Sequence, residues 1–145
     1  MERSFGLFVD IKFVQGDAEK LPFESDSFDI YTIAFGLRNV TNTDKALAEA
    51  HRVLKRGGRF MCLEFSRVTV PVLQQVYDQY SFSVIPLLGE LIAQDRASYQ
   101  YLVESIRQFH SQEDLAALMK QAGFSAVNFT NLNFGIVAIH SGVKL

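Results

Sequence analysis

Three short motifs carry side chains that could bind a ligand or take part in a reaction. The first is GDAEKLPF, residues 16–23, in which Gly16 allows tight backbone geometry and Asp17 offers a carboxylate. Open α/β sheets bind ligands at the carboxyl ends of their strands, and a carboxylate there can accept a hydrogen bond from an adenine amino group or a hydroxyl. The alternative is that Asp17 only organises its own turn, as aspartate often does.

The second motif is FGLRNV, residues 35–40, which directly follows a short apolar run. Arg38 is a fixed cation with planar donors, suited to an oxyanion or a polar substituent on a ring. Asn39 can both donate and accept hydrogen bonds. The alternative is an arginine on the surface and an asparagine that caps the next helix, because loops serve both purposes.

The third motif is LEFS, residues 63–66, where Glu64 interrupts an apolar stretch. Burying a lone carboxylate is costly, so Glu64 either pairs with a cation or points into solvent at the end of a strand. Cys62 lies two residues earlier and has no cysteine neighbour, which favours a buried structural thiol.

The elements that must position these motifs follow from the spacing of apolar residues. The sequence predicts strands at residues 11–14, 28–34, 59–65, 126–132 and 136–141, and helices at residues 43–55 and 111–122. Residues 70–109 are expected to be helical but irregular, with residues 131–135 as a hairpin connection. A strand, a helix and a strand with short joins form a right-handed βαβ unit. The sequence therefore predicts an α/β sandwich that ends in an antiparallel strand pair.

Specific residues are expected to begin and end the helices. Thr41 or Thr43 can cap the first helix, and Gly57 suits a left-handed stop after it. Ser111 with the acidic residue three positions later resembles a capping box, and Gly123 ends the second helix.

Composition narrows the class of protein. The 145 residues favour one domain, and 48% hydrophobic with 21% charged residues is ordinary for a globular chain. A net charge of −2 gives no basic surplus for a nucleic-acid partner. No apolar run reaches the roughly 20 residues that span a bilayer. A single cysteine excludes an internal disulfide and favours a reducing compartment. The three histidines share no metal-ligand spacing, so no metal site is expected.

Read in order, several segments resemble one family. They are GDAEKLPF, FDIYTIAFGLRNV, HRVLKRGGRFMCLEFS, DRASYQYLVESI and GIVAIHSGVKL. Together they are similar to the C-terminal part of the ubiquinone and menaquinone biosynthesis C-methyltransferases, over residues 11–145. The LPF loop and the helix ending in LKRGG occur across many S-adenosylmethionine-dependent methyltransferases. FGLRNV, and SYQYLVESI followed by AIHSG, point to this one family.

The resemblance implies a fold, a cofactor and a reaction. The fold is a partial Rossmann-like class I S-adenosylmethionine-dependent methyltransferase fold, with residues 1–145 forming one incomplete domain. The reaction is methyl transfer from S-adenosyl-L-methionine to a ring carbon of a polyprenylated benzoquinol in ubiquinone biosynthesis. Asp17 and Ala18 then border the adenine, and Arg38 with Asn39 serves catalysis. Arginine stays protonated and is a poor base, but it can hold a phenolate oxygen and position a water that takes the proton. Replacing Arg38 is then expected to leave thermal stability nearly unchanged.

The family also implies partners and a place in the cell. These are a multi-subunit ubiquinone-biosynthesis complex, a homodimer, and peripheral contact with the matrix face of the mitochondrial inner membrane, or the bacterial cytoplasm for a prokaryotic chain. Residues 70–92 are rich in apolar side chains that suit an acceptor pocket and a membrane-facing rim. The open alternative is that they form core or a dimer interface.

One departure from the family is large. The glycine-rich motif that embraces the methionine end of the cofactor is absent, as is the acidic residue that binds the ribose; the first two strands of the family are missing. The chain is therefore expected to be a fragment, an isoform or a partial gene model that is inactive alone. The strand at residues 28–34 becomes an exposed apolar edge, unless residues 11–14 pair beside it. A non-catalytic interaction partner is the alternative function.

Overall fold

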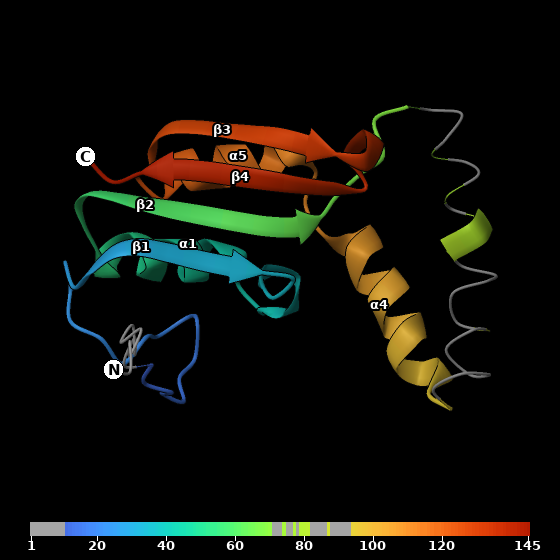
Figure 1. The fold of residues 1–145 in the computed structure, drawn as a ribbon, viewed down its shortest axis with the longest axis horizontal. Coiled ribbons are helices and arrows are strands. Elements are labelled where there is room, and N and C mark those ends of the chain that lie inside the picture. The colour runs from blue at the N-terminus through green and yellow to red at the C-terminus, as the bar shows by residue number, and fades with distance from the viewer. Residues whose placement is uncertain (1–10, 71–73, 75–76, 78, 82–86, 88–93) are drawn as a thin grey trace, which may run out of the picture.

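The computed structural model describes residues 11–70, 74, 77, 79–81, 87 and 94–145. Its centre is a four-stranded sheet in the order β1-β2-β4-β3 (Figure 1). The strands are β1 (Phe28–Ala34), β2 (Leu54–Phe65), β3 (Ser125–Leu132) and β4 (Val137–Val143). β1 runs parallel to β2, whereas β4 is antiparallel to both β2 and β3. The predicted C-terminal antiparallel pair is thus confirmed.

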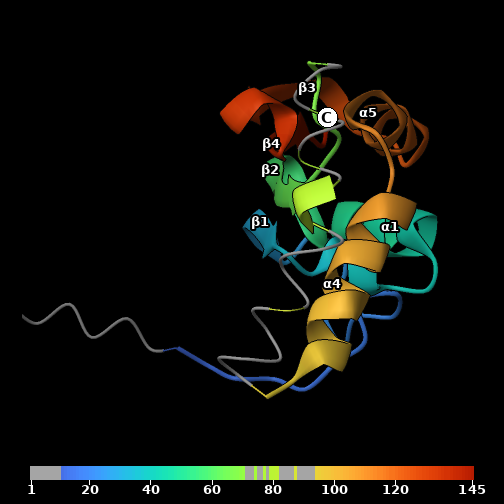
Figure 2. The same cartoon turned by 90° about the vertical axis from the view of Figure 1, so that its right-hand side faces the viewer.

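Three helices whose bounds the structure describes accompany the sheet. They are α1 (Thr43–Val53), α4 (Arg96–Gln108) and α5 (Gln112–Gln121). One short 3₁₀-helix, Leu37–Asn39, lies between β1 and α1, and another, Asn133–Gly135, connects β3 to β4. α1 and α5 lie on the same side of the sheet, whereas α4 extends from the end where β2 finishes (Figures 1 and 2). The strand–helix–strand unit β1-α1-β2 matches the predicted βαβ unit.

The core lies between the sheet and the helices α1 and α5. Leu47 of α1, Phe60 of β2 and Met119 of α5 are all 1% exposed or less, and they belong to one apolar cluster. The apolar positions of α1 and α5 fall on one face of each helix because the helical repeat is 3.6 residues. This packing fixes α1 against the sheet, and it therefore also fixes the position of the first turn of that helix.

The first helix ends earlier than its apolar pattern predicted. α1 stops at Val53, and β2 begins at Leu54 rather than at residue 59. Gly57 does have a positive φ of 82°, but it lies within β2, where the register with β1 shifts. Gly57 therefore serves an irregularity of the strand and not the helix stop that was predicted.

The predicted cap residue is correct for α5 and wrong for α1. Ser111 caps α5 as predicted: its Oγ accepts from the backbone N of Asp114 at 3.1 Å and donates to the Asp114 carboxylate at 2.6 Å. The cap residue of α1 is Asn42, not a threonine, and its side chain makes no cap hydrogen bond. That side chain binds Glu19 instead.

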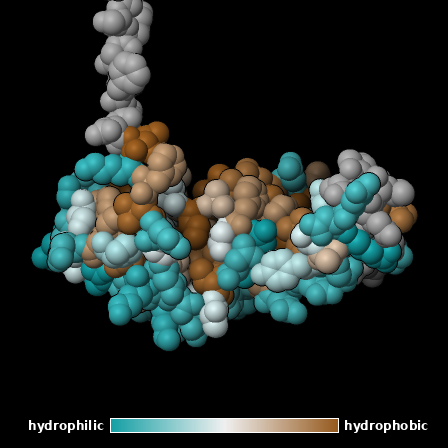
Figure 3. All heavy atoms as spheres, turned by 90° about the horizontal axis from the view of Figure 1, so that it is seen from below, coloured by the Kyte–Doolittle hydropathy of each residue, from teal (hydrophilic) through white to brown (hydrophobic). Residues whose placement is uncertain are grey.

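The predicted strand at residues 11–14 is wrong. These residues have no regular structure, and Phe13 is 95% exposed. A strand needs a neighbour that supplies hydrogen bonds, and among the described residues β1 pairs with β2 alone. β1 is therefore an open edge, with Ile30 63% exposed and apolar side chains gathered on this side of the molecule (Figure 3).

The irregular region is described only in part. Within the predicted range 70–109, α4 is a regular helix capped by Asp95, whose carboxylate accepts from the backbone N of Ser98. In its predicted apolar stripe, Val103 is buried and Tyr99 remains 36% exposed. Most of residues 71–93 lie outside the described residues.

Candidate functional site

The parallel pairing of β1 and β2 brings two of the three motifs together. Ala34, the last residue of β1, pairs with Leu63 near the end of β2. Arg38 therefore follows β1 at the same edge of the sheet where β2 carries Glu64. Parallel strands end side by side, and this edge is where open α/β sheets place their ligands.

Arg38 and Glu64 form a buried ion pair. The Arg38 Nη1 lies 3.2 Å from each carboxylate oxygen of Glu64, and the backbone N of Arg38 lies 3.3 Å from Oε1. The backbone N of Phe65 donates to Oε2 at 2.9 Å. The side chain of Glu64 is 1% exposed and that of Arg38 is 10% exposed. Of the two alternatives for Glu64, the structure shows the pairing with a cation, and Arg38 is not a surface arginine.

The Arg38 guanidinium makes further contacts besides those with Glu64. Nη1 donates to the carbonyl oxygen of Phe35 at 2.6 Å, and Cζ lies 5.5 Å from the ring centroid of Phe65, within reach of a cation–π interaction. Its Nε is buried and has no hydrogen-bond partner among the described residues. A buried donor without an acceptor is unfavourable by about 1–3 kcal/mol. Nη2 makes no hydrogen bond in the described structure and is not closed off in this way, so it is the guanidinium nitrogen that an acceptor oxygen could reach.

Asn39 is fixed by a residue from α4. Its Oδ1 accepts from the hydroxyl of Tyr101 at 3.0 Å, and its Nδ2 lies 3.5 Å from the carbonyl oxygen of Phe35. Asn39 does not cap a helix, since the cap residue of α1 is Asn42. Tyr101 belongs to the SYQYLVESI segment, but nothing in its spacing singled it out from its neighbours.

A cavity of about 360 Å³ opens beside this cluster. Its walls come from the segment after β1, from α4 and from the loop that follows α4. They are formed by Arg38, Val40, Thr41, Thr43, Tyr101, Glu104, Ser105, Gln108, Phe109 and His110. The cavity thus joins a buried cation with hydroxyl, amide and carboxylate groups, a mixture suited to a small polar ring.

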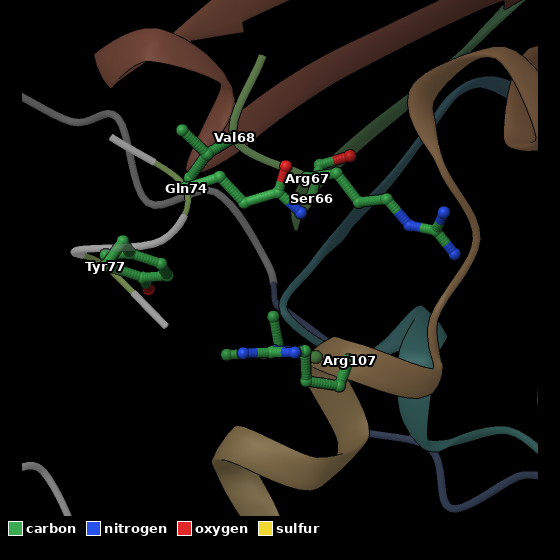
Figure 4. A pocket seen from close by; sticks show the side chains of 7 residues that line it. Ser66, Arg67, Val68, Gln74, Tyr77 and Arg107 are labelled. Atoms are coloured by element: carbon green, nitrogen blue, oxygen red, sulfur yellow. The ribbon is translucent and has the colours of Figure 1, made fainter. Parts of the chain in front are cut away.

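A second cavity, of about 250 Å³, lies between the residues that follow β2 and the end of α4. Figure 4 shows Ser66, Arg67 and Val68 on one side of it and Arg107 of α4 on the other, with Gln74 and Tyr77 completing the wall. Tyr80 and Leu87, described residues of the predicted acceptor segment, are each 48% exposed. The other apolar side chains of residues 70–92, which were predicted to help form the acceptor pocket, lie mainly outside the described residues.

Asp17 organises its own turn. Its Oδ1 accepts from the backbone N of Glu19 at 2.9 Å, and its carbonyl oxygen accepts from the backbone N of Lys20 at 3.0 Å. Asp17 is exposed, whereas Ala18 is half-buried against the core cluster. The alternative of a turn-forming aspartate is therefore realised, although only one of its carboxylate oxygens has a hydrogen bond in the described structure.

The loop that carries Asp17 and Ala18 is tied to α1. Glu19 accepts from the backbone N and the Nδ2 of Asn42 at 2.8 and 2.7 Å, and these bonds lower the pKa of Glu19. Further along, Glu49 accepts from the backbone N of Leu21 at 2.8 Å. Since Asn42 comes three residues after Asn39, the loop and the Arg38–Asn39 pair lie around the same end of α1. No hydrogen bond joins the two pairs directly in the part of the chain that is described.

Cys62 has the structural role that was predicted. It is fully buried in β2, and burial raises the pKa of its thiol to about 12. A thiol held in its neutral form is a poor nucleophile, so Cys62 contributes packing rather than reactivity.

None of the helices that the structure describes has the length and apolar character that crossing a bilayer requires.

The chain is similar to a set of named proteins over nearly all of its length. It is 64% identical over 140 residues to the mitochondrial 2-methoxy-6-polyprenyl-1,4-benzoquinol methylase of Xenopus laevis, and 62% identical over 140 residues to the Homo sapiens protein of the same name. These matches cover 97% of the chain but only 45% and 43% of those two relatives. The Oryza sativa relative is 63% identical over 135 residues and is covered to 46%. The chain thus spans less than half the length of these relatives.

Solved structures support the fold. A SAM-dependent methyltransferase from Thermotoga maritima matches with a TM-score of 0.65 at 22% identity, covering 91% of this chain and 63% of that one. A SAM-dependent methyltransferase from Aquifex aeolicus matches with a TM-score of 0.59 at 12% identity, covering 92% and 55%. At these identities the likeness concerns the fold, and it confirms a partial Rossmann-like methyltransferase fold.

The family comparison agrees with both. The family described as the ubiE/COQ5 methyltransferase family matches residues 2–144, and the segments that carry the Arg38–Glu64 cluster and the Asp17 turn both fall inside that match. The chain belongs to the ubiE/COQ5 methyltransferase family.

Proposed function

We propose that this chain is the acceptor-binding half of an S-adenosylmethionine-dependent C-methyltransferase of ubiquinone biosynthesis. The complete enzyme would methylate a ring carbon of 2-methoxy-6-polyprenyl-1,4-benzoquinol, the substrate named in its relatives. The 145 residues alone would not be competent. Support for the last point comes from length, because the chain spans 43–46% of those relatives, and from its sequence, which contains no G-x-G turn.

The observation that carries the proposal is the buried Arg38–Glu64 pair beside the 360 Å³ cavity. Methylation of a ring carbon is fastest when a neighbouring phenolic oxygen carries negative charge, and the ring must then lose a proton. A preorganised cation stabilises such a charge best in a site shielded from water. Arg38 would hold the oxygen, while Asn39, fixed by Tyr101, would orient a water that removes the proton.

The described residues fit one end of the implied cofactor. A free carboxylate oxygen on Asp17 and the half-buried Ala18 suit the amino edge and the face of an adenine. When bound, S-adenosylmethionine supplies the methyl group. The role of the chain's own residues is to border the adenine and to present the acceptor oxygen at Arg38.

The proposal extends to a location and to partners. Those relatives are named mitochondrial, so we propose a mitochondrial location. Peripheral contact with the matrix face of the inner membrane, a ubiquinone-biosynthesis complex and a homodimeric arrangement are the finer parts of the proposal, and they rest on the family resemblance. Exposed Tyr80 and Leu87 supply apolar surface for that contact.

The test restores the missing length. The chain is joined to the preceding segment of the Xenopus laevis relative, and methyl transfer to a demethylated polyprenyl benzoquinol is measured. The joined protein is expected to be active and the 145-residue chain inactive. In the joined protein, Arg38→Lys should lower kcat about 10²–10³-fold, as for loss of one oxyanion donor. Asp29→Asn, on an exposed ion pair, is the control and should retain full kcat. A folded joined protein that binds S-adenosylmethionine without methylating the quinol would contradict the proposal.

The open edge of β1 supports a second candidate, a non-catalytic protein that binds a partner subunit. Isothermal titration of the 145-residue chain with S-adenosylmethionine separates the two. Micromolar binding of S-adenosylmethionine favours the proposed methyltransferase function. The interaction role is favoured if the chain does not bind S-adenosylmethionine but does bind the preceding segment of a relative.

A further inference from the structure

Glu64 has no part in the chemistry described so far, yet it is the most deeply buried acidic side chain near the site. Its carboxylate accepts from three donors: the Nη1 of Arg38, the backbone N of Arg38 and the backbone N of Phe65. All three are N–H donors, and one of them belongs to a guanidinium cation. The pair that faces the cavity therefore has a net charge near zero, although its cation is permanent.

The pairing also decides which part of Arg38 remains for a ligand. The two N–H groups of Nη1 are used by the carbonyl oxygen of Phe35 and by the Glu64 carboxylate. One face of the guanidinium lies against Phe65. Nε is left without an acceptor among the described residues. Nη2 also makes no hydrogen bond in the described structure and, unlike Nε, is not closed off from solvent, so a ligand oxygen would approach the guanidinium at Nη2.

We propose that Glu64 is a positioning residue that balances the charge of Arg38, so that the cavity takes a neutral phenol that ionises in place rather than a permanently charged carboxylate or phosphate. The idea rests on the proposed function, because it takes a phenolic acceptor at Arg38 as given. An unbalanced buried guanidinium would bind any small anion strongly. A guanidinium whose charge is balanced by Glu64 still offers a hydrogen-bond donor to a neutral phenol. Its attraction for an anion is too weak to offset the cost of removing that anion from water.

The other titratable groups that line the cavity are Tyr101 and Glu104 of α4 and His110 of the following loop. Tyr101 is hydrogen-bonded to Asn39, and Glu104 accepts from Gln100 at 2.7 Å. In the described structure none of them is hydrogen-bonded to the Arg38 guanidinium. The charge of Glu64 should therefore affect the ionisation of a phenol bound at Arg38 more directly than any of these groups does.

The test uses the 145-residue chain and 4-nitrophenol, which absorbs visible light only as the phenolate. The pH midpoint of the bound nitrophenol is measured in the native chain and in Glu64→Gln. Removing the balancing charge should lower that midpoint by about one pH unit, a tenfold rise in the phenolate-to-phenol ratio at fixed pH. The affinity for benzoate, a permanent anion, should rise about tenfold in the same variant.

Two further variants control the measurement. Asp29→Asn removes the carboxylate of an exposed ion pair with Lys55 from the same pair of strands, and it should leave the midpoint unchanged. The double variant Arg38→Gln with Glu64→Gln removes both charges, and it should return the midpoint to that of free nitrophenol. A structural role for Glu64 would not move the midpoint in this ordered way.

The outcomes are decisive in both directions. A midpoint in Glu64→Gln equal to the native one, or a native chain that binds no nitrophenol, would overturn the inference. If Glu64→Gln loses the native circular dichroism spectrum, Glu64→Asp takes its place, because it moves the carboxylate away from Arg38 by the length of one methylene. Glu64→Asp should shift the midpoint in the same direction, and an unshifted midpoint refutes the inference. The titration needs no methyl transfer, so a joined protein that shows the shift but no methylation would refute the proposed function alone.

Discussion

At Arg38, one side chain serves both the fold and the proposed chemistry. It neutralises a carboxylate that is 1% exposed, and both partners are withdrawn from water. Removing one partner of such a pair leaves an uncompensated buried charge, which lowers the free energy of unfolding by about 3–5 kcal/mol. That is a large fraction of the stability of a typical domain.

We therefore predict that Arg38→Ala is strongly destabilised, contrary to the expectation that its stability would be nearly unchanged. Urea denaturation followed by circular dichroism measures the change. Lys55→Ala, which breaks the exposed pair with Asp29, is the control and should behave almost like the native chain, since exposed pairs contribute little. A native-like unfolding midpoint for Arg38→Ala would show that Glu64 finds another partner. Because a lost fold also abolishes turnover, Arg38→Lys is the better variant for the reaction.

Between elements, His140 joins β4 to α5. It is 1% exposed, and its Nε2 lies 2.9 Å from the carbonyl oxygen of Gln112, so this nitrogen carries the proton of the neutral ring. Burial lowers the pKa of His140 below its value in the unfolded chain, near 6.5. The unfolded chain therefore binds the extra proton first, and stability falls as the pH drops below about 6.5.

This predicts a measurable loss of stability between about pH 6.5 and pH 5. The hydrogen-bonded carboxylates, such as Glu19 and Glu49, have lowered pKa values and lose their contribution only at lower pH. Unfolding midpoints in urea across this range should change less in His140→Asn than in the native chain. His51, whose pKa is also lowered by burial, adds in the same direction, so His51→Asn is the matched comparison. An identical pH slope in all three proteins would mean that neither histidine is linked to folding.

How far the sequence predicts these elements depends on where each one finds its partner. β1, α1 and α5 were predicted almost to the residue because their own apolar spacing reports the face that they bury. The segment 11–14 has the apolar and β-branched residues of a strand, but strand formation depends on a neighbour that local sequence does not encode. Gly57 was correctly predicted to adopt a left-handed conformation, but it was assigned to the wrong element. A glycine indicates a backbone conformation and does not show whether a helix or a strand uses it.

The site shows the same limit. Arg38 and Asn39 were singled out as candidates by residue type, and Glu64 was noticed because a carboxylate in an apolar strand is unusual. That Glu64 is the partner of Arg38 required the register in which Ala34 pairs with Leu63. Tyr101 could not be found, because its contact with Asn39 spans 62 residues and depends on the direction that α4 takes from the sheet. Tertiary contacts of this kind leave no periodic signal in one sequence.

For the whole molecule, the open edge of β1 is the feature with the widest consequences. One side of β1 pairs with β2, and in the described structure no strand pairs with the other. A groove of about 230 Å³ runs beside that edge, lined by Leu21, Phe23, Phe28, Ile30, Tyr31, Thr32 and Val53. Unpaired backbone groups beside apolar side chains form a template for pairing with another chain.

We predict that the purified 145-residue chain self-associates through this edge as its concentration rises. Analytical ultracentrifugation should show the weight-average mass increasing well above 16.4 kDa. Ile30→Lys places a charge at a 63% exposed position on the edge and should hold the chain near that mass, because natural edge strands are protected from pairing in this way. Leu132→Lys, at the end of β3 on the opposite edge, adds the same charge to a 38% exposed position and should not prevent association. Joining the preceding segment of a relative should act as Ile30→Lys does, since a strand paired with β1 removes the template. A chain that stays monomeric without either change would show that the β1 edge is already protected, and association that Leu132→Lys alone abolishes would place the contact on β3.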